Sequence, residues 1–93
     1  MKQIYMDHAA TTPVDVEVKK EMDRFYSEDF GNPGSFNNYG LKAKKALNEA
    51  RGKVASVLNC GNDEIIFVGS GTESINLAIQ GLAKFYKGKK DHI

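Results

Sequence analysis

The stretch EIIFVGSGTES, residues 64–74, places the strongest constraint on how this chain can fold. Residues 64–68 form a β-branched and aromatic run of strand length. Gly69 and Gly71 then flank a serine, and the apolar residues that follow recur at three- and four-residue steps, which predicts a helix. This order predicts a strand–turn–helix unit over residues 64–87, the first part of a parallel crossover, and therefore an α/β fold. The apolar positions of the helix are Ile75, Ala78, Ile79, Leu82, Ala83 and Tyr86.

An N-terminal segment, residues 1–35, precedes this unit and contains one predicted helix. The helix begins near Val16 with Asp15 as its N-cap, because an aspartate oxygen can accept hydrogen bonds from the free N–H groups of a helix start. The glycines and proline of FGNPGS, residues 30–35, end it. Its apolar positions lie on one helical face and are Val18, Met22, Phe25 and Tyr26.

A long helix over about residues 38–60 is the clearest predicted element, because its apolar residues recur at helical spacing. Asn37 or Asn38 is expected to cap its start, and Gly61 to close its end. We expect the chain, residues 1–93, to be a single partial domain whose next strand begins near Ile93. A small self-contained α+β domain is the alternative. The apolar positions of the helix are Ala43, Ala46, Leu47, Ala50, Val54, Val57 and Leu58.

Composition excludes several classes of function. Thirteen basic and twelve acidic residues give a net charge of +1, which predicts neither a nucleic acid nor a membrane as partner. No apolar run approaches the roughly 20 residues of a membrane span, and Asp7 and His8 interrupt any signal-peptide pattern. A single cysteine, Cys60, cannot form an internal disulfide, so we expect a cytoplasmic protein. His8 and His92 lack partners at metal-ligand spacing, and no metal site is expected.

The glycine turn allows two interpretations that do not exclude each other. A helix start preceded by glycines presents free N–H groups that suit a phosphate. Ser70 and Glu73 also match the S-x-x-E capping box, in which the two residues satisfy the helix start between themselves. The turn has no lysine, so it is not a nucleoside-triphosphate loop. The dinucleotide pattern ranks second, because Ser74 replaces its third glycine and Asp91 precedes rather than ends the next strand.

Four stretches in order carry a resemblance to a known family: YMDHAATTP at 5–13, FGNPGS at 30–35, EIIFVGSGTES at 64–74 and INLAIQGLA at 75–83. Together they resemble the pyridoxal-phosphate-dependent cysteine desulfurases of the class V aminotransferase superfamily. The resemblance implies an incomplete N-terminal portion of a fold-type I large domain, in a protein that forms a homodimer. It also implies an enzyme that takes sulfur from L-cysteine, releases L-alanine and holds the sulfur as a persulfide. The sulfur then passes to an acceptor or scaffold protein, for iron–sulfur cluster or other sulfur-cofactor assembly.

By position, the resemblance assigns Gly71 and Thr72 to the phosphate of pyridoxal 5'-phosphate and leaves Glu73 as a capping residue. It also directs attention to Ala10, Thr11 and Asn32, which either border the site or only shape turns. Asn37 stands where the family often has histidine. An asparagine cannot titrate near neutral pH, so it suits helix capping instead.

The resemblance assigns no catalytic residue to this chain. The cofactor-binding lysine, the stacking histidine and the loop with the catalytic cysteine have no counterparts in it, and Cys60 stands at an ordinary family position. We therefore expect the 93-residue chain alone to be inactive. Three alternatives remain open: another class V pyridoxal-phosphate enzyme, a dinucleotide-binding module, and a non-catalytic interaction fragment.

Overall fold

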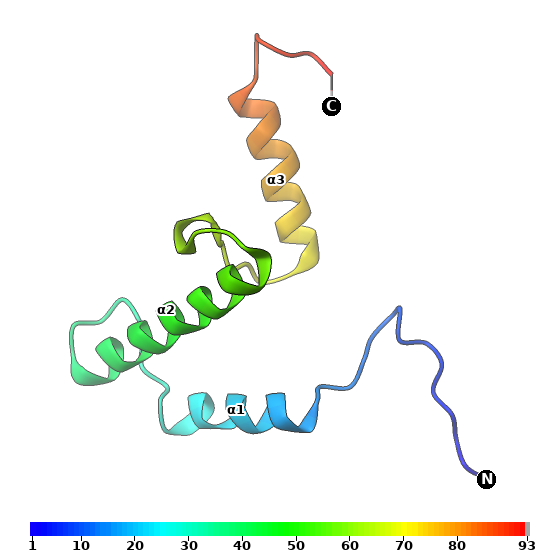
Figure 1. Ribbon diagram of the computed structural model, residues 1–93, viewed down its shortest axis with the longest axis vertical. Coiled ribbons are helices and arrows are strands. Elements are labelled where there is room, and N and C mark those ends of the chain that lie inside the picture. Colours follow the sequence, from blue (N-terminus) through cyan, green and yellow to red (C-terminus); the bar gives the residue numbers. More distant parts are fainter. Residues whose placement is uncertain (93) are drawn as a thin grey trace. The chain divides into compact units, whose positions relative to one another are not determined.

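The computed structural model describes residues 1–92, which form three α-helices and one short 3-10 helix (Figure 1). The chain divides into two compact units, Met1–Arg51 and the part from Gly52 onward. No helix in residues 1–92 is long and apolar enough to cross a membrane. The elements in chain order are α1 (Val16–Ser27), α2 (Asn38–Leu58), η1 (Asn62–Glu64) and α3 (Gly71–Phe85).

Helix α1 begins as the sequence predicts. Asp15 is its N-cap, and the Asp15 Oδ1 atom accepts a 2.8 Å hydrogen bond from the Glu17 N–H. The helix ends at Ser27, and the N–H of the following Glu28 donates to the Arg24 carbonyl oxygen at 3.0 Å. Helix α1 therefore ends just before residues 30–35, the stretch predicted to terminate it.

The loop after α1 lies directly against the first turn of α2, and two glycines allow this approach. A Cβ at Gly31 would overlap the Tyr39 carbonyl, and a Cβ at Gly40 would overlap the Ser35 carbonyl. The rings of Phe30 and Tyr39 also meet, with centroids 5.4 Å apart. Side chains at positions 31 and 40 would separate the loop from the helix.

Helix α2 is capped by Asn37, one of the two asparagines predicted for this role. Its Oδ1 atom accepts a 2.9 Å hydrogen bond from the Gly40 N–H, the third residue of the helix. Nearby, the carboxylate of Asp29, of which only 9% is exposed, contacts the Lys42 ammonium and lies 3.9 Å from Arg24 Nε. These charges connect the end of α1 to the start of α2.

Helix α2 is not closed by Gly61, as the sequence predicts, but ends three residues earlier. The helix ends at Leu58, and Asn59 adopts a left-handed conformation with φ 54°. The Cys60 N–H donates to the Ala55 carbonyl at 3.0 Å and the Asn59 N–H donates to the Ser56 carbonyl at 3.3 Å, the paired bonds of a Schellman motif. Asn59 closes the helix because asparagine tolerates this conformation. Gly61 instead precedes η1.

The strand predicted at residues 64–68 is not formed in the described part of the chain. Glu64 belongs to η1, and Ile65 follows it in an extended conformation with φ −99° and ψ 123°. The backbone at Ile65 is therefore extended, as the strand prediction requires. A strand also requires pairing with a neighbouring strand, and no strand is formed within residues 1–92. The strand expected to begin at Ile93 lies outside the described residues.

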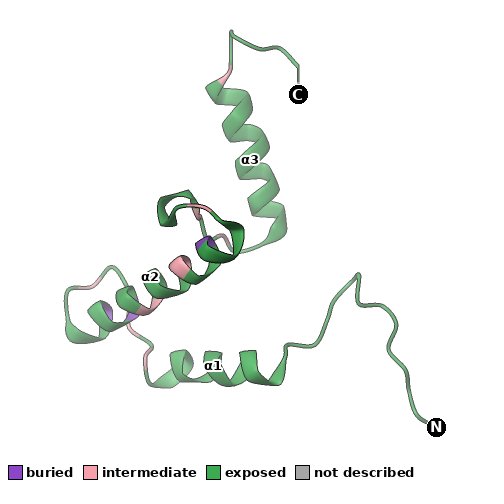
Figure 2. Ribbon diagram, viewed as in Figure 1, coloured by how far each residue is buried: buried purple, intermediate pink, exposed green. Residues whose placement is uncertain are grey.

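Most apolar side chains of the described residues remain accessible to solvent (Figure 2). Only Ala43, 8% exposed, and Ala55, 1% exposed, form the buried hydrophobic set. The sequence favours Tyr5, Phe25, Tyr26 and Phe67 as core residues rather than cofactor contacts, but these side chains are between 38% and 74% exposed. The prediction that they are core residues is wrong for this chain, because an amphipathic helix buries its apolar face only where another element covers it.

Candidate functional site at the start of helix α3

The turn before α3 is held by a serine cap. Ser70 is extended, with φ −162° and ψ 163°, and its Oγ atom accepts a 3.1 Å hydrogen bond from the Glu73 N–H. The Ser70 carbonyl accepts the first bond of the helix, from the Ser74 N–H at 3.1 Å. The predicted role of Ser70 as N-cap is therefore confirmed.

Glu73 completes the cap in a way that the sequence motif does not specify. Its Oε2 atom accepts a 2.7 Å hydrogen bond from the Gly69 N–H, one residue before the N-cap. In the usual capping box the carboxylate accepts from the N-cap residue itself. A carboxylate acceptor makes this a charge-assisted bond, which is stronger than one between neutral groups.

Gly71 and Thr72, the two predicted cofactor-binding residues, are the first residues of α3. Within residues 1–92 the structure gives no acceptor for the N–H groups of Ser70, Gly71 and Thr72, nor a partner for the Thr72 hydroxyl. Apart from its chain neighbours and the backbone of its own helix, no heavy atom lies within 4 Å of the position that a Cβ would take at Gly71. The helix has 15 residues, so its start carries a partial positive charge. The turn therefore has free donors, favourable charge and room for an anion.

Asn76 extends this arrangement by one helical turn. Its Nδ2 atom donates a 2.9 Å hydrogen bond to the Thr72 carbonyl, and its Oδ1 atom accepts from Gln80 Nε2 at 3.2 Å. The side chain thus bonds back to the first turn of α3.

The other residues to which the resemblance points lie in the unit of residues 1–51, where each shapes its own loop. The Ala10 N–H donates to the Asp7 carbonyl at 3.1 Å, and the Thr11 carbonyl lies 2.9 Å from the Tyr5 hydroxyl. Asn32 closes a turn in which its Oδ1 atom accepts from the Gly34 N–H at 2.8 Å. The sequence did not predict that the Tyr5 hydroxyl donates to the Thr11 carbonyl, since an aromatic residue type carries no signal of a specific acceptor.

Residues 1–92 contain no group of three or more His, Cys, Asp or Glu side chains placed to hold a metal ion. Cys60 is a free, half-buried thiol at the last residue of the Schellman motif. This agrees with the interpretation of Cys60, from its ordinary sequence position, as a surface or half-buried thiol rather than a reactive one.

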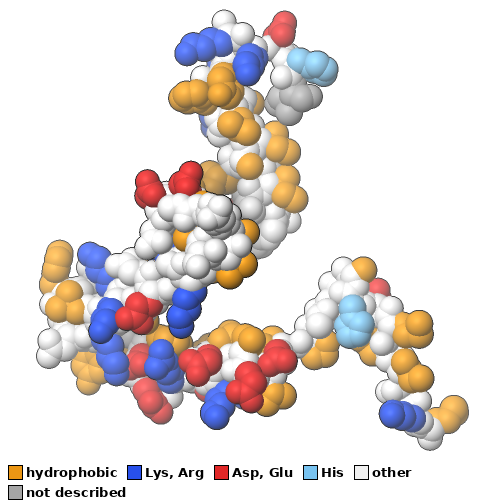
Figure 3. Space-filling model, viewed as in Figure 1, with side chains coloured by type: hydrophobic (Ala, Val, Ile, Leu, Met, Phe, Trp, Pro, Cys, Tyr) orange, Lys and Arg blue, Asp and Glu red, His pale blue; other side chains and the backbone are white. Residues whose placement is uncertain are grey.

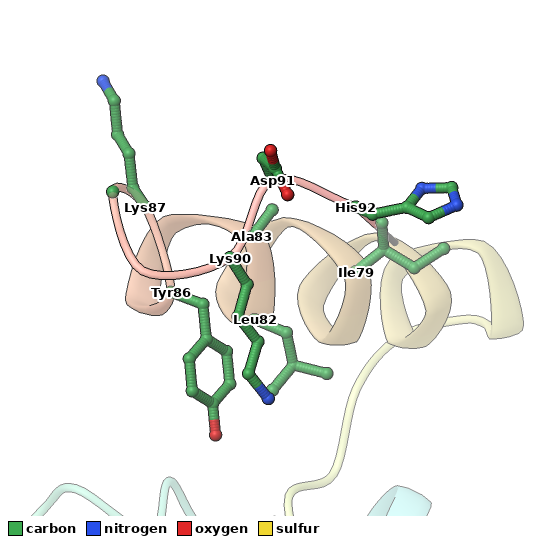
Figure 4. Close-up of a pocket in the computed structure, with 9 residues that line it drawn as sticks. Ile79, Leu82, Ala83, Tyr86, Lys87, Lys90, Asp91 and His92 are labelled. Carbon is green, nitrogen blue, oxygen red and sulfur yellow. The ribbon is translucent and has the colours of Figure 1, made fainter.

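A hollow of about 530 Å³ lies elsewhere in the second unit, between α3 and the segment that follows it (Figure 4). Ile79, Leu82 and Tyr86 line its apolar side, and Figure 3 shows hydrophobic side chains gathered along α3. Asp91, the acid weighed for dinucleotide binding, also lines it. We favour the turn at Gly71 as the site, because three consecutive N–H groups have no acceptor there, whereas the wall of the hollow is largely the exposed apolar face of α3.

The chain belongs to the class V aminotransferase family, whose sequence pattern matches residues 4–93. It is 48% identical over 91 residues to the cysteine desulfurases IscS of Rickettsia massiliae (strain Mtu5) and Rickettsia akari (strain Hartford). Each match covers 97% of this chain and 22% of the relative. The chain therefore spans about a fifth of the length of these curated relatives.

A solved NifS-like protein has the same fold over this segment. The TM-score is 0.91 at 40% sequence identity, and the match covers 96% of this chain and 24% of the solved chain. The fold is therefore that of one part of a NifS-like protein, in agreement with the predicted incomplete α/β domain.

Proposed function

We propose that this chain is part of a pyridoxal-phosphate-dependent cysteine desulfurase, and that Gly71 and Thr72 hold one end of the cofactor. The observation that carries the proposal is the set of free donors at the start of α3, in a chain similar to proteins called cysteine desulfurase. A phosphate accepts hydrogen bonds from backbone N–H groups at a helix start and is stabilised by the partial positive charge there.

The residues of this chain fit the phosphate end of the cofactor. The Gly71 and Thr72 N–H groups and the Thr72 hydroxyl would donate to phosphate oxygens, and the absence of a side chain at Gly71 lets an anion approach the backbone. When bound, pyridoxal phosphate acts as an electron sink for bonds around the α-carbon of an amino acid. This chain's contribution is to bind and orient it.

The proposed net reaction breaks the carbon–sulfur bond of L-cysteine and forms a sulfur–sulfur bond to an enzyme thiol. L-Cysteine and the thiol give L-alanine and an enzyme persulfide, so atoms and protons balance without an added oxidant. We further propose that the complete enzyme is a cytoplasmic homodimer and that its persulfide sulfur passes to an acceptor protein. The thiol is not Cys60, and the 93-residue chain alone does not catalyse the reaction.

Purification of the complete enzyme tests this proposal. It is expected to be yellow from bound cofactor and to release alanine from L-cysteine with a persulfide as co-product. A colourless, fully folded enzyme would refute the cofactor assignment. A yellow enzyme that converts another amino acid but not L-cysteine would favour a different class V activity.

The role of Thr72 is tested by Thr72→Val, which keeps the shape of the side chain and removes its hydroxyl. We expect cofactor affinity to fall by about tenfold, the loss of a hydrogen bond to a charged group. Ser74→Ala is the matched control, because it removes a hydroxyl from the same turn of α3 without touching the proposed donors. Equal affinities in the two variants would contradict the assignment of Thr72.

A further inference from the structure

The two hydrogen bonds of the Glu73 side chain and backbone enclose the free donors of the turn. The Gly69 N–H donates to Glu73 Oε2 at 2.7 Å, and the Glu73 N–H donates to Ser70 Oγ at 3.1 Å. Both ends of the turn are thus engaged by the protein. The N–H groups between them, including those of Gly71 and Thr72, stay available to a ligand.

The two glycines of the turn have different steric surroundings. A Cβ at Gly69 would lie 3.2 Å from Glu73 Oε2, closer than an ordinary contact, whereas a Cβ at Gly71 would meet nothing within 4 Å. A methyl group at position 69 would therefore displace the Glu73 carboxylate by a few tenths of an ångström, whereas one at position 71 would displace no side chain. The missing side chain at Gly69 lets the carboxylate reach the N–H group.

We propose that Glu73 is a positioning residue for the phosphate-binding turn, acting through the Gly69 N–H, and that Gly69 serves Glu73 while Gly71 serves the ligand. The inference rests on the proposed phosphate site. A carboxylate beside an anion site costs binding energy through repulsion. Its bond to Gly69 offsets that cost by holding the turn in the conformation in which the remaining donors point to the ligand, so that binding need not order it.

The test compares the affinities of the complete enzyme, freed of cofactor, for pyridoxal phosphate and for pyridoxal, which lacks the phosphate. We expect Glu73→Ala to weaken binding of pyridoxal phosphate by about tenfold while changing pyridoxal binding little. Glu73→Gln retains an oxygen acceptor for Gly69 and is expected to restore most of the preference for the phosphorylated ligand. If Glu73→Gln loses the preference as fully as Glu73→Ala does, the bond to Gly69 is not the cause.

Glu64→Ala is a matched control for a general loss of stability. Glu64 Oε2 accepts a hydrogen bond from the Gly61 N–H at 2.7 Å, the same length and the same groups as the Glu73 bond, but at η1. A purely structural role predicts that both variants lower the melting temperature of the cofactor-free enzyme and leave the preference for the phosphorylated ligand unchanged. That result would overturn the proposal.

Gly69→Ala tests the same bond in a chain that keeps Glu73, and so serves if Glu73→Ala does not fold. We expect Gly69→Ala to lower the preference for pyridoxal phosphate over pyridoxal in the parent enzyme. In a Glu73→Ala background it should add nothing, because both changes disrupt the same bond between Gly69 and Glu73. Additive losses would refute the assignment. An unmodified enzyme without any preference for pyridoxal phosphate would instead refute the proposed phosphate site itself, and this inference with it.

Discussion

Gly31→Ala is the change that best tests the packing of the loop after α1. The added methyl group would overlap the Tyr39 carbonyl and lie 2.9 Å from the Gly40 nitrogen. These are backbone atoms in the first turn of α2, so no side-chain rotation relieves the overlap. The loop or the helix start must shift, at a cost of about 1–3 kcal/mol of stability, as in other overpacked sites.

Gly34→Ala, in the same loop, is the matched control. Its methyl group would meet only the Asn32 Oδ1 atom, at 3.3 Å, and a small shift of that side chain would weaken its hydrogen bond to the Gly34 N–H, by up to about 1 kcal/mol. Gly88 is the only glycine of the described residues with a positive φ, so alanine is compatible with the backbone at position 34. The reduced freedom of the unfolded chain favours the variant by about 0.4–1 kcal/mol. We expect a change of stability close to zero.

The assay is thermal unfolding of the complete enzyme, followed by circular dichroism with and without added cofactor. We expect Gly31→Ala to lower the melting temperature by a few degrees or more and Gly34→Ala to leave it nearly unchanged, which corresponds to about 2–4 °C for each kcal/mol in a large domain. Equal melting temperatures for the two variants would refute the argument that close backbone approach requires glycine at position 31.

Three further outcomes are expected. Asn59→Ala should lower stability by about 1 kcal/mol and Asn59→Gly should not, because only the alanine is strained at φ 54°. Denaturant unfolding measures both variants, and equal stabilities would contradict the Schellman assignment. Asn37→Ala should lower stability by about 1 kcal/mol and Asn37→Ser by much less, since serine also caps a helix. The same unfolding measurement checks both variants. If Asn37→His were more stable than Asn37→Ser, position 37 would have a role beyond capping. Cys60→Ser should retain alanine release from L-cysteine in the complete enzyme, and loss of that activity with an intact fold would show that the thiol takes part.

The positions of the helices follow from short-range signals, which is why the sequence predicts them well. Asp15 and Ser70 cap α1 and α3, and Asn37 caps α2, because a cap needs only a polar side chain within three residues of the N–H it serves. The apolar repeats likewise depend only on helical geometry. The boundary at Gly61 was wrong because asparagine and glycine both accept a left-handed conformation, and the local sequence offered both.

Features that depend on distant or finely placed atoms appear only in the structure. The run EIIFV has the composition of a strand, but a strand forms only where it pairs with a neighbouring strand, and residues 1–92 contain no strand. The capping motif likewise predicted that Glu73 turns back, but not that it bonds to Gly69 instead of Ser70.

The sequence by itself determined the family, the three helices and the two residues, Gly71 and Thr72, at which we propose that a phosphate binds. These follow from the order of motifs and from local hydrogen-bonding rules. Only the tertiary structure decided that the donors between Gly69 and Glu73 are free, and that Gly31 and Gly40 allow a loop to lie against α2. Such facts depend on interatomic distances to within a few tenths of an ångström. A sequence pattern specifies residue types and spacing but not those distances.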